Sequence, residues 1–517
     1  MTVAQDDSLE QSEAVASSPP QAPESAEPEK SKTERKPLGP AVHTTARIDP
    51  IELSYRLRAF ENYPIAEMLR RADRAVYNQC LEEQAHARQF TERHIWPFVE
   101  QWDQVAAEEH GFVPWPAIDA GMEYGLLSLM VPANLGGRGV GAVAGAVHAE
   151  EIAAADAGVF VLFGAHELAM AGIAASLHPG PLFRIMGEIA DGEKRGKAVL
   201  LALAYTEPTA GSDVEDGEDI ARAKLASRWE QVPGGYRVNA RKVFISNGSI
   251  ARYSMVAAWG DPSRPNETAM GFLIPNDAPG YSVGRVERKM GQRLCPASEI
   301  ICEDVFVPEE NAWHLTDNAR MIDTVLSITR GPVGAMSVGI ARGCMERTLK
   351  YLAQKRVGGR WLFEEQWVQL LLAEIFGRIQ AGRGLYMDAA FALEHWGFGK
   401  LQRATDTPLV SMVRKTRVFQ RILNSGQASQ QMAAAYSRAV SKEALQRCVS
   451  VSSTAKFMCS DMAVEVCGRA MDILGEDAND PQWGVEKCLR DAKLGQIFEG
   501  TNQLNRLHVT RGLLRRQ

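Results

Sequence analysis

Cysteines are few and scattered in this 517-residue sequence, and no two of the eight form a C-x-x-C pair. They lack the clustered Cys/His spacing of a structural zinc site. The first ten residues include Asp6, Asp7 and Glu10, where a secretory signal needs basic and then apolar residues. We therefore expect reduced thiols, no metal site and a cytoplasmic location.

Long hydrophobic runs are also lacking. The most apolar stretch, Gly158–Leu177, is interrupted by His166 and Glu167, whereas a transmembrane helix needs about 20 consecutive apolar residues. An excess of basic residues is missing too, because 57 basic residues stand against 64 acidic ones and give a formal charge of -7. The chain lacks the basic surface of a general nucleic-acid binder. We expect neither a membrane span nor a nucleic-acid partner.

The remaining composition, 45% hydrophobic and 23% charged, is that of a globular protein with a large core. Residues 1–45 are rich in Ser, Pro, Ala, Glu and Lys and are predicted to be a disordered tail. Helical periodicity covers 46–198 and 314–517, and Val338 to Leu352 form one apolar helix face. Between them, 199–313 holds short predicted strands at 236–245, 253–259, 281–286 and 300–307, separated by Pro, Gly and Asn turns. The predicted fold class is α+β and mostly α. A doubly wound sheet is not expected, because strands and helices do not alternate.

A glycine motif, Gly139-Val-Gly141-Ala-Val-Ala144, matches the dinucleotide-binding fingerprint with Ala in the last place. The acidic residues Glu150 and Glu151 follow too early, and no βαβ pattern continues from it. A flexible Gly-rich loop is the favoured interpretation.

Three separated segments carry residues suited to chemistry. In Leu203–Asp213, Pro208 and Gly211 force a turn, and Thr206 and Ser212 can hydrogen-bond a polar ring system. Taken alone, this segment could also be an ordinary capped turn.

The second segment, Val238–Gly248, is a predicted strand that ends in an Asn-Gly turn, with Phe244 and Ser246 on one face. By itself it indicates a hairpin. In the third, Leu489–Arg506, a helix leads into Glu499-Gly500, and Thr501 can N-cap the next helix. A carboxylate between Phe498 and Gly500 could be partly desolvated, which would raise its pKa and make it a competent base. A capping-turn Glu is the alternative.

Together, Thr206-Glu-Pro-Thr-Ala-Gly-Ser-Asp213 and Glu499-Gly-Thr501 resemble motifs of the acyl-CoA dehydrogenase flavoprotein family. Residues 279–293 and 303–308 are also typical of that family, and the resemblance covers about 85–515. It implies an N-terminal helical domain (46–198), a small β-barrel (199–313) and a C-terminal four-helix bundle (314–517). FAD would lie between the barrel and the bundle.

The resemblance assigns a role to each matched position. It implies that Ser212 also faces the thioester, that Arg330 contacts CoA and that Gly500 contacts the acyl thioester. The FAD contacts that it implies are Tyr205, Thr206, Gly211, Ser212, Phe244, Ser246, Arg356, Thr501 and Gln503. Arg356 belongs to a motif that reaches a neighbouring subunit's FAD, and this motif is altered here to Arg356-Val-Gly-Gly-Arg360. A homodimer or homotetramer is expected.

By resemblance, Glu499 is the base that removes the α-proton of an acyl-CoA while the β-hydrogen leaves as hydride to flavin N5. An alternative base position beside Arg330 holds Thr329. Electron-transferring flavoprotein is the expected acceptor. An oxygen-reactive oxidase or monooxygenase and a non-catalytic flavoprotein are competing functions on this scaffold, and Glu499 argues against the monooxygenase.

The acyl pocket is expected near Phe160–His166 by analogy with the family. Gly164 would leave room for a bulky or cyclic acyl group. His166 and Glu167 would add polar options, although His166 could equally be a hydrogen-bonded core histidine.

Overall fold

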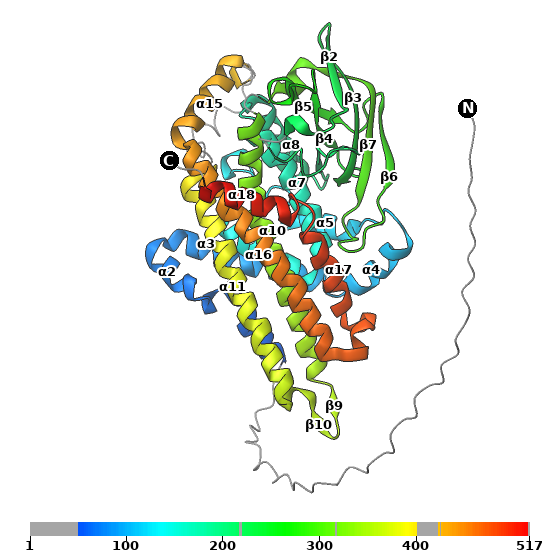
Figure 1. The fold of residues 1–517 in the computed structure, drawn as a ribbon, viewed down its shortest axis with the longest axis vertical. Helices are drawn as coiled ribbons and strands as arrows, with labels where there is room; N and C mark the ends of the chain where they lie inside the picture. The colour runs from blue at the N-terminus through cyan, green and yellow to red at the C-terminus, as the bar shows by residue number, and fades with distance from the viewer. Residues whose placement is uncertain (1–49, 217–219, 316–317, 401–421, 424, 515–517) are drawn as a thin grey trace, which may run out of the picture. The chain divides into compact units, whose positions relative to one another are not determined.

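The computed structural model describes residues 50–216, 220–315, 318–400, 422–423 and 425–514. The predicted disordered tail, 1–45, lies outside the described residues. Helices, then strands, then helices follow one another along the chain, as the sequence predicts (Figure 1). The first helices are α1 (Pro50–Arg58), α2 (Pro64–Ala72), α3 (Arg74–His94), α4 (Val99–Glu108), α5 (Trp115–Glu123), α6 (Ala142–Ala155), α7 (Ala157–Ala175) and α8 (Pro179–Lys194).

Helix α7 contains the apolar stretch of the sequence. It is long and apolar enough to cross a membrane, but 78% of its most apolar window is buried inside the protein. A helix that is hydrophobic on all sides must be covered on all sides, and α7 is covered by α6, α8, α10 and the sheet. Asp156 caps it by accepting the Val159 N–H at 2.7 Å. In this structure α7 is a core helix.

The strands form one sheet in the order β6-β7-β3-β2-β4-β5-β8, and β1 pairs with β4. The expected strands at 236–245, 253–259, 281–286 and 300–307 all form. The strands are β1 (Leu201–Ala204), β2 (Arg228–Val232), β3 (Gly235–Ser246), β4 (Tyr253–Trp259), β5 (Ala269–Pro275), β6 (Tyr281–Val286), β7 (Ala297–Pro308) and β8 (Ala312–His314), with the short helix α9 (Pro265–Thr268) between β4 and β5.

The C-terminal helices α10, α11 and α16 run side by side, with the sheet at one end and the small β9–β10 hairpin at the other (Figure 1). The apolar face predicted from Val338 to Leu352 is buried. These elements are α10 (Asn318–Leu352), β9 (Arg356–Val357), β10 (Arg360–Trp361), α11 (Gln366–Trp396), α15 (Gly426–Ala439), α16 (Lys442–Leu474), α17 (Val485–Gly495) and α18 (Asn502–Leu514).

Close packing of α6 on α10 joins the two helical regions. A Cβ added at Gly343 of α10 would lie 2.0 Å from the Ala154 carbonyl oxygen of α6, and one at Gly339 would lie 2.5 Å from the Glu150 oxygen. Only glycine permits this approach, which holds α10 in place beside the cavity described below.

The Gly-rich motif does not follow a strand. Residues 126–131 form turns, and Gly136 and Gly139 take left-handed φ of 93° and 66° before α6 begins. The favoured interpretation as a loop is therefore confirmed. All eight cysteines are buried and free, as expected.

Candidate active site

A cavity of about 550 Å³ lies between the helices and the sheet. Helices α6, α7, α10 and α11, strands β1 and β3 and the turn before α18 contribute to its wall. Tyr205, Thr206, Phe244, Ser246 and Glu499 all line it. The structure therefore brings together residues from the three segments that the sequence singled out.

Three polar contacts fix the first segment to the others. The Thr501 N–H points to Ser212 Oγ at 3.4 Å, which joins the first segment to the third. Lys242 of β3 is fully buried, and its Nζ donates to Glu207 at 2.9 Å and to the Tyr205 carbonyl oxygen at 3.0 Å. The Glu207 carboxylate, within the motif itself, therefore holds the turn against the strand that carries Phe244 and Ser246.

Phe244 has an unusual backbone for a large side chain. Its φ is 57°, and the pairing of β3 with β7 shifts register between Lys242 and Ile245. The bulge turns the ring out of the sheet, so that 62% of Phe244 is exposed and the ring borders the cavity. Ser246 borders the same cavity, and a Cβ at Gly211 would meet no atom within 4 Å. The Phe244 ring, the Ser246 hydroxyl and the free space beside Gly211 suit a flat ring system with polar edges.

Glu499 lies in a strained turn between α17 and α18. Its φ is 55° and that of Gly500 is 73°, so two successive residues are left-handed. Arg330 Nε donates to the Glu499 carbonyl oxygen at 3.1 Å. Lys456 Nζ and Asn505 Nδ2 donate to the Gly500 carbonyl oxygen at 2.7 and 2.8 Å. These buried donors hold the turn in a conformation that its sequence disfavours.

The Glu499 carboxylate accepts a hydrogen bond of 2.6 Å from Thr329 Oγ1. Burial raises the pKa of Glu499 above its ordinary value, and the Thr329 hydrogen bond and the charges of Arg330 and Lys456 oppose that rise. Burial, reinforced by the charge of Arg330, lowers the pKa of Lys456 to about 7. The site therefore holds a buried carboxylate that is more basic than an ordinary glutamate.

A second carboxylate, Glu215, lines the same cavity and was not anticipated from the sequence. Burial raises its pKa to about 7, and the charge of Glu499 contributes to the rise. A Cβ added at Gly500 would lie 2.9 Å from Arg330 Nη2 and 3.0 Å from Glu215 Oε2. Among the described residues these two buried atoms have no hydrogen-bond partner. They face the same space, where a ligand with polar groups would satisfy both.

Arg330 is held on its other side by Ser453 Oγ at 2.8 Å and His508 Nδ1 at 2.7 Å. Lys456 and Glu215 could not have been singled out from their surroundings in the sequence. Lys456 lies in the middle of an ordinary helical stretch, and Glu215 follows the recognised motif by two residues.

Five of the residues expected at the cofactor are not part of the cavity wall: Gly211, Ser212, Arg356, Thr501 and Gln503. Arg356 is on the β9–β10 hairpin at the far end of the long helices, and its guanidinium stacks on Trp361 at 3.9 Å (Figure 1). Gln503 is exposed on α18. Within one chain, Arg356 is not brought to the other site residues, whereas Gln503 follows Thr501 by two residues.

His166 is a core histidine. It is fully buried, its Nε2 lies 2.9 Å from the Leu127 carbonyl oxygen, and its Nδ1 accepts the Leu201 N–H at 3.1 Å. The proton is therefore on Nε2, and burial lowers the pKa of the ring to about 4. Gly164, in contrast, lines the cavity, and only the Phe160 ring lies within 4 Å of its Cβ position.

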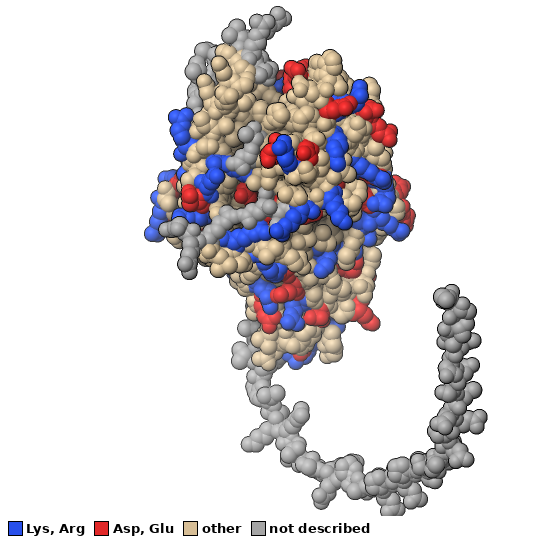
Figure 2. All heavy atoms as spheres, turned by 45° about the horizontal axis from the view of Figure 1, so that its top comes forward, with Lys and Arg blue, Asp and Glu red and all other residues tan. Residues whose placement is uncertain are grey.

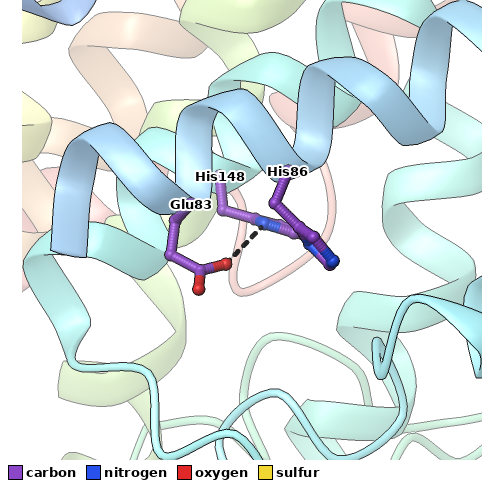
Figure 3. Close-up of side chains that lie close together, drawn as sticks. All are labelled: Glu83, His86 and His148. Carbon is purple, nitrogen blue, oxygen red and sulfur yellow. Dashed lines mark ion pairs between the residues drawn. The ribbon is translucent and has the colours of Figure 1, made fainter.

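A cluster of possible metal ligands occurs elsewhere in the helical region. Glu83 and His86 of α3 meet His148 of α6, with Glu83 Oε2 3.3 Å from His148 Nδ1 (Figure 3). Arg138 already donates to Glu83 Oε1, and its Nη1 lies 2.8 Å from His86 Nδ1. Burial and this guanidinium lower the pKa of His86 to about 4. The cluster already contains its cation, which argues against a divalent metal there.

Basic and acidic side chains are interspersed on the face drawn in Figure 2, and the basic ones are the more prominent across its middle.

Comparison with known proteins shows which family this chain matches. The N-terminal, middle and C-terminal domains of acyl-CoA dehydrogenase match residues 81–177, 202–305, and 319–402 with 399–514. Cyclohex-1-ene-1-carbonyl-CoA dehydrogenase of Geobacter metallireducens is 30% identical over 412 residues, which is 79% of this chain and 92% of that protein. Subunit CarC of the caffeyl-CoA reductase-Etf complex of Acetobacterium woodii is 25% identical and covers 83% and 97%.

Solved structures share the fold of this chain. The butyryl-CoA dehydrogenase of Megasphaera elsdenii superimposes with a TM-score of 0.65 at 24% identity, over 84% of this chain and 98% of that one. The matched domains account for most of the chain and occur in the order of the observed helices, sheet and helices. The chain therefore belongs to the acyl-CoA dehydrogenase family of FAD-dependent oxidoreductases.

Proposed function

We propose that this protein oxidises an acyl-CoA thioester to the 2-enoyl-CoA, with Glu499 removing the α-proton. One observation carries the proposal: a desolvated carboxylate on a strained turn borders a large cavity. An α-proton beside a thioester is weakly acidic, so the base must have a raised pKa and be shielded from water. Glu499 meets both conditions.

The cavity wall fits FAD as the oxidant. Tyr205, Thr206, Ser212, Phe244 and Ser246 would line the flavin, Gly211 would also contact the cofactor, and Thr501 and Gln503 would contact its adenosine half. Arg356 would contact the FAD of a second copy, since it is exposed at the far end of its own chain. When bound, FAD supplies the acceptor for the hydride that leaves the β-carbon.

Substrate positioning falls to residues beside the base. Ser212 and Gly500 would contact the thioester, and Arg330 would contact the CoA portion. Arg330 Nη2 has no protein partner among the described residues and faces the space next to Gly500. Backbone N–H groups near a developing enolate stabilise its negative charge.

The cavity is suited to a bulky or cyclic acyl group. Glycines at positions 145 and 164 leave space in the part of the wall formed by α6 and α7, where larger side chains would intrude. The relative from Geobacter metallireducens named above acts on a cyclic acyl-CoA according to its name.

We further infer that electron-transferring flavoprotein accepts the electrons and that the protein works as a homodimer or homotetramer. The name of the CarC relative includes an Etf complex. Large apolar side chains are exposed along one stretch of α11, namely Trp367, Leu370 and Phe376, which is the kind of surface that a second copy would cover.

An anaerobic absorbance experiment tests the function. The purified flavoprotein is mixed with short, branched, cyclic, aromatic and dicarboxylic acyl-CoAs, and loss of flavin absorbance is recorded. Bleaching by one class that disappears in Glu499→Gln supports the proposal. A yellow protein that no thioester bleaches, or one whose reduced flavin is rapidly reoxidised by air, would instead support the non-catalytic or oxygen-reactive function.

A further inference from the structure

Glu167 is a carboxylate in the wall of the acyl cavity. It lies on α7, on the same side as Phe160 and Gly164, since residues at spacings of three and four share a helix face. All three line the large cavity, and Glu167 also lines a smaller neighbouring one of about 80 Å³. The Glu167 carboxylate and the Glu499 base therefore border one continuous space.

Among the described residues, Glu167 makes no hydrogen bond and no ion pair. Its neighbours in the two cavity walls are mostly apolar and include Met130, Leu168 and Ile328. Burial alone raises the pKa of Glu167 to about 8, and no nearby group opposes that rise. Glu167 is half-buried, so its carboxylate is open to the cavity. A carboxylate without a protein partner in a mostly apolar wall is unfavourable, so its presence calls for an explanation.

Other buried or half-buried carboxylates of the N-terminal helices have protein partners. Glu150 is held by Arg342 and Arg383, Glu83 by Arg138, and Asp156 by Lys487. Glu193 receives the Leu127 N–H at 2.8 Å. The fold thus supplies a partner to its structural carboxylates and leaves Glu167 without one at the cavity.

We propose that Glu167 is a specificity-determining residue that binds a hydroxyl group on the distal part of the acyl chain or ring. This inference rests on the proposed function, in which the acyl group occupies this cavity. A carboxyl group that is largely protonated near neutral pH both donates and accepts, which matches a hydroxyl. The substrate class is then an acyl thioester with a hydroxylated, bulky or cyclic acyl group.

Matched substrate pairs test the inference. Cyclohexanecarbonyl-CoA is compared with its ring-hydroxylated analogues, and hexanoyl-CoA with its terminally hydroxylated analogue, by anaerobic flavin bleaching. In the wild type, we expect kcat/KM for a hydroxylated member to exceed that of its partner by about 10- to 100-fold, as for sites whose buried polar group would otherwise stay unpaired.

Two variants and a control make the result specific. Glu167→Leu should abolish the preference and favour the plain hydrocarbon, whereas Glu167→Gln, which still donates and accepts, should keep part of it. Glu82→Leu, an exposed glutamate of α3, serves as the control and should leave the preference unchanged. Flavin content and thermal melting show whether each variant folds, and Glu167→Leu should melt at or above the wild-type temperature.

The outcomes separate this inference from the proposed function. If thioesters bleach the flavin but neither hydroxylated member is preferred, or if Glu167→Leu keeps the preference, the inference is wrong while the dehydrogenase function stands. If no thioester bleaches the flavin, the proposed function fails. Equilibrium binding of the hydroxylated and plain enoyl-CoA products to the wild type and Glu167→Leu then still measures whether Glu167 recognises the hydroxyl.

Discussion

The Thr329 hydroxyl and the Glu499 carboxylate, 170 residues apart in sequence, are joined by a 2.6 Å hydrogen bond. Thr329 belongs to α10 and Glu499 to the turn before α18, so the bond links the bundle to the proposed base. It stabilises the ionised carboxylate against the effect of burial.

Removing this hydrogen bond should shift the pH dependence of the reaction. In Thr329→Val the pKa of Glu499 rises further, because burial is then less opposed. The base works only when ionised, so the acidic limb of the kcat/KM profile should move to higher pH and activity at neutral pH should fall. Thr329→Ser retains a hydroxyl and should keep the wild-type profile. If the acidic limb does not move in Thr329→Val, a group other than Glu499 controls that limb.

Replacing the proposed base should remove the chemical step. We expect Glu499→Gln to lower the rate of anaerobic flavin bleaching by about 10²- to 10⁴-fold, as for the loss of a general base, while flavin content is retained. Glu215→Gln is the decisive comparison, because Glu215 is the other carboxylate with a raised pKa at this cavity. A larger loss in Glu215→Gln than in Glu499→Gln would reassign the base.

The α6–α10 contact should tolerate no side chain at Gly343. Its Cβ would lie 2.0 Å from the Ala154 oxygen, so Gly343→Ala must separate the helices and should lower the free energy of unfolding by about 1–3 kcal/mol or more. In Gly384→Ala, on α11, the added Cβ meets no atom within 4 Å, so the free energy of unfolding should rise by about 0.5–1 kcal/mol. Thermal and urea unfolding compare the two, and equal effects would contradict the packing argument.

Glu150 should contribute stability that acid removes. Burial disfavours its charge, but Arg383 and Arg342 outweigh burial and lower its pKa to about 2. The unfolded value is higher, so the contribution is complete above about pH 4.5 and disappears as the pH falls towards 2, with a size of about 3 kcal/mol. In urea titrations the difference in unfolding free energy between wild type and Glu150→Gln should shrink on acidification. If the difference in unfolding free energy does not change with pH, the proposed contribution of Glu150 is wrong.

Much of the architecture could be predicted from local pattern. Alternating short strands bounded by Pro and Gly predicted β4 and β6 at their observed bounds, and Thr501 was expected to cap α18, where its Oγ1 accepts the Leu504 N–H at 3.3 Å. These features depend on neighbouring residues, so they can be recognised within a short window of sequence.

The electrostatic surroundings of the base could not be predicted in this way. Lys456 contacts the turn at Gly500 from a different helix, and Glu215 faces Arg330 only because α10 and the first motif meet in three dimensions. The acids Glu150 and Glu151, which follow the misleading glycine motif, bind arginines of α10 and α11 instead of a nucleotide. Such partners depend on tertiary packing, which a single sequence does not display.

The left-handed backbone at Glu499 has a consequence for the evolution and engineering of this protein. Glycine adopts such a φ freely, whereas a glutamate there adds strain, and its carboxyl group must also leave water. Glu499→Gly would relieve both penalties while removing the proposed base. Selection for thermostability alone would therefore favour an inactive protein. A screen for more stable variants must also select for catalytic activity.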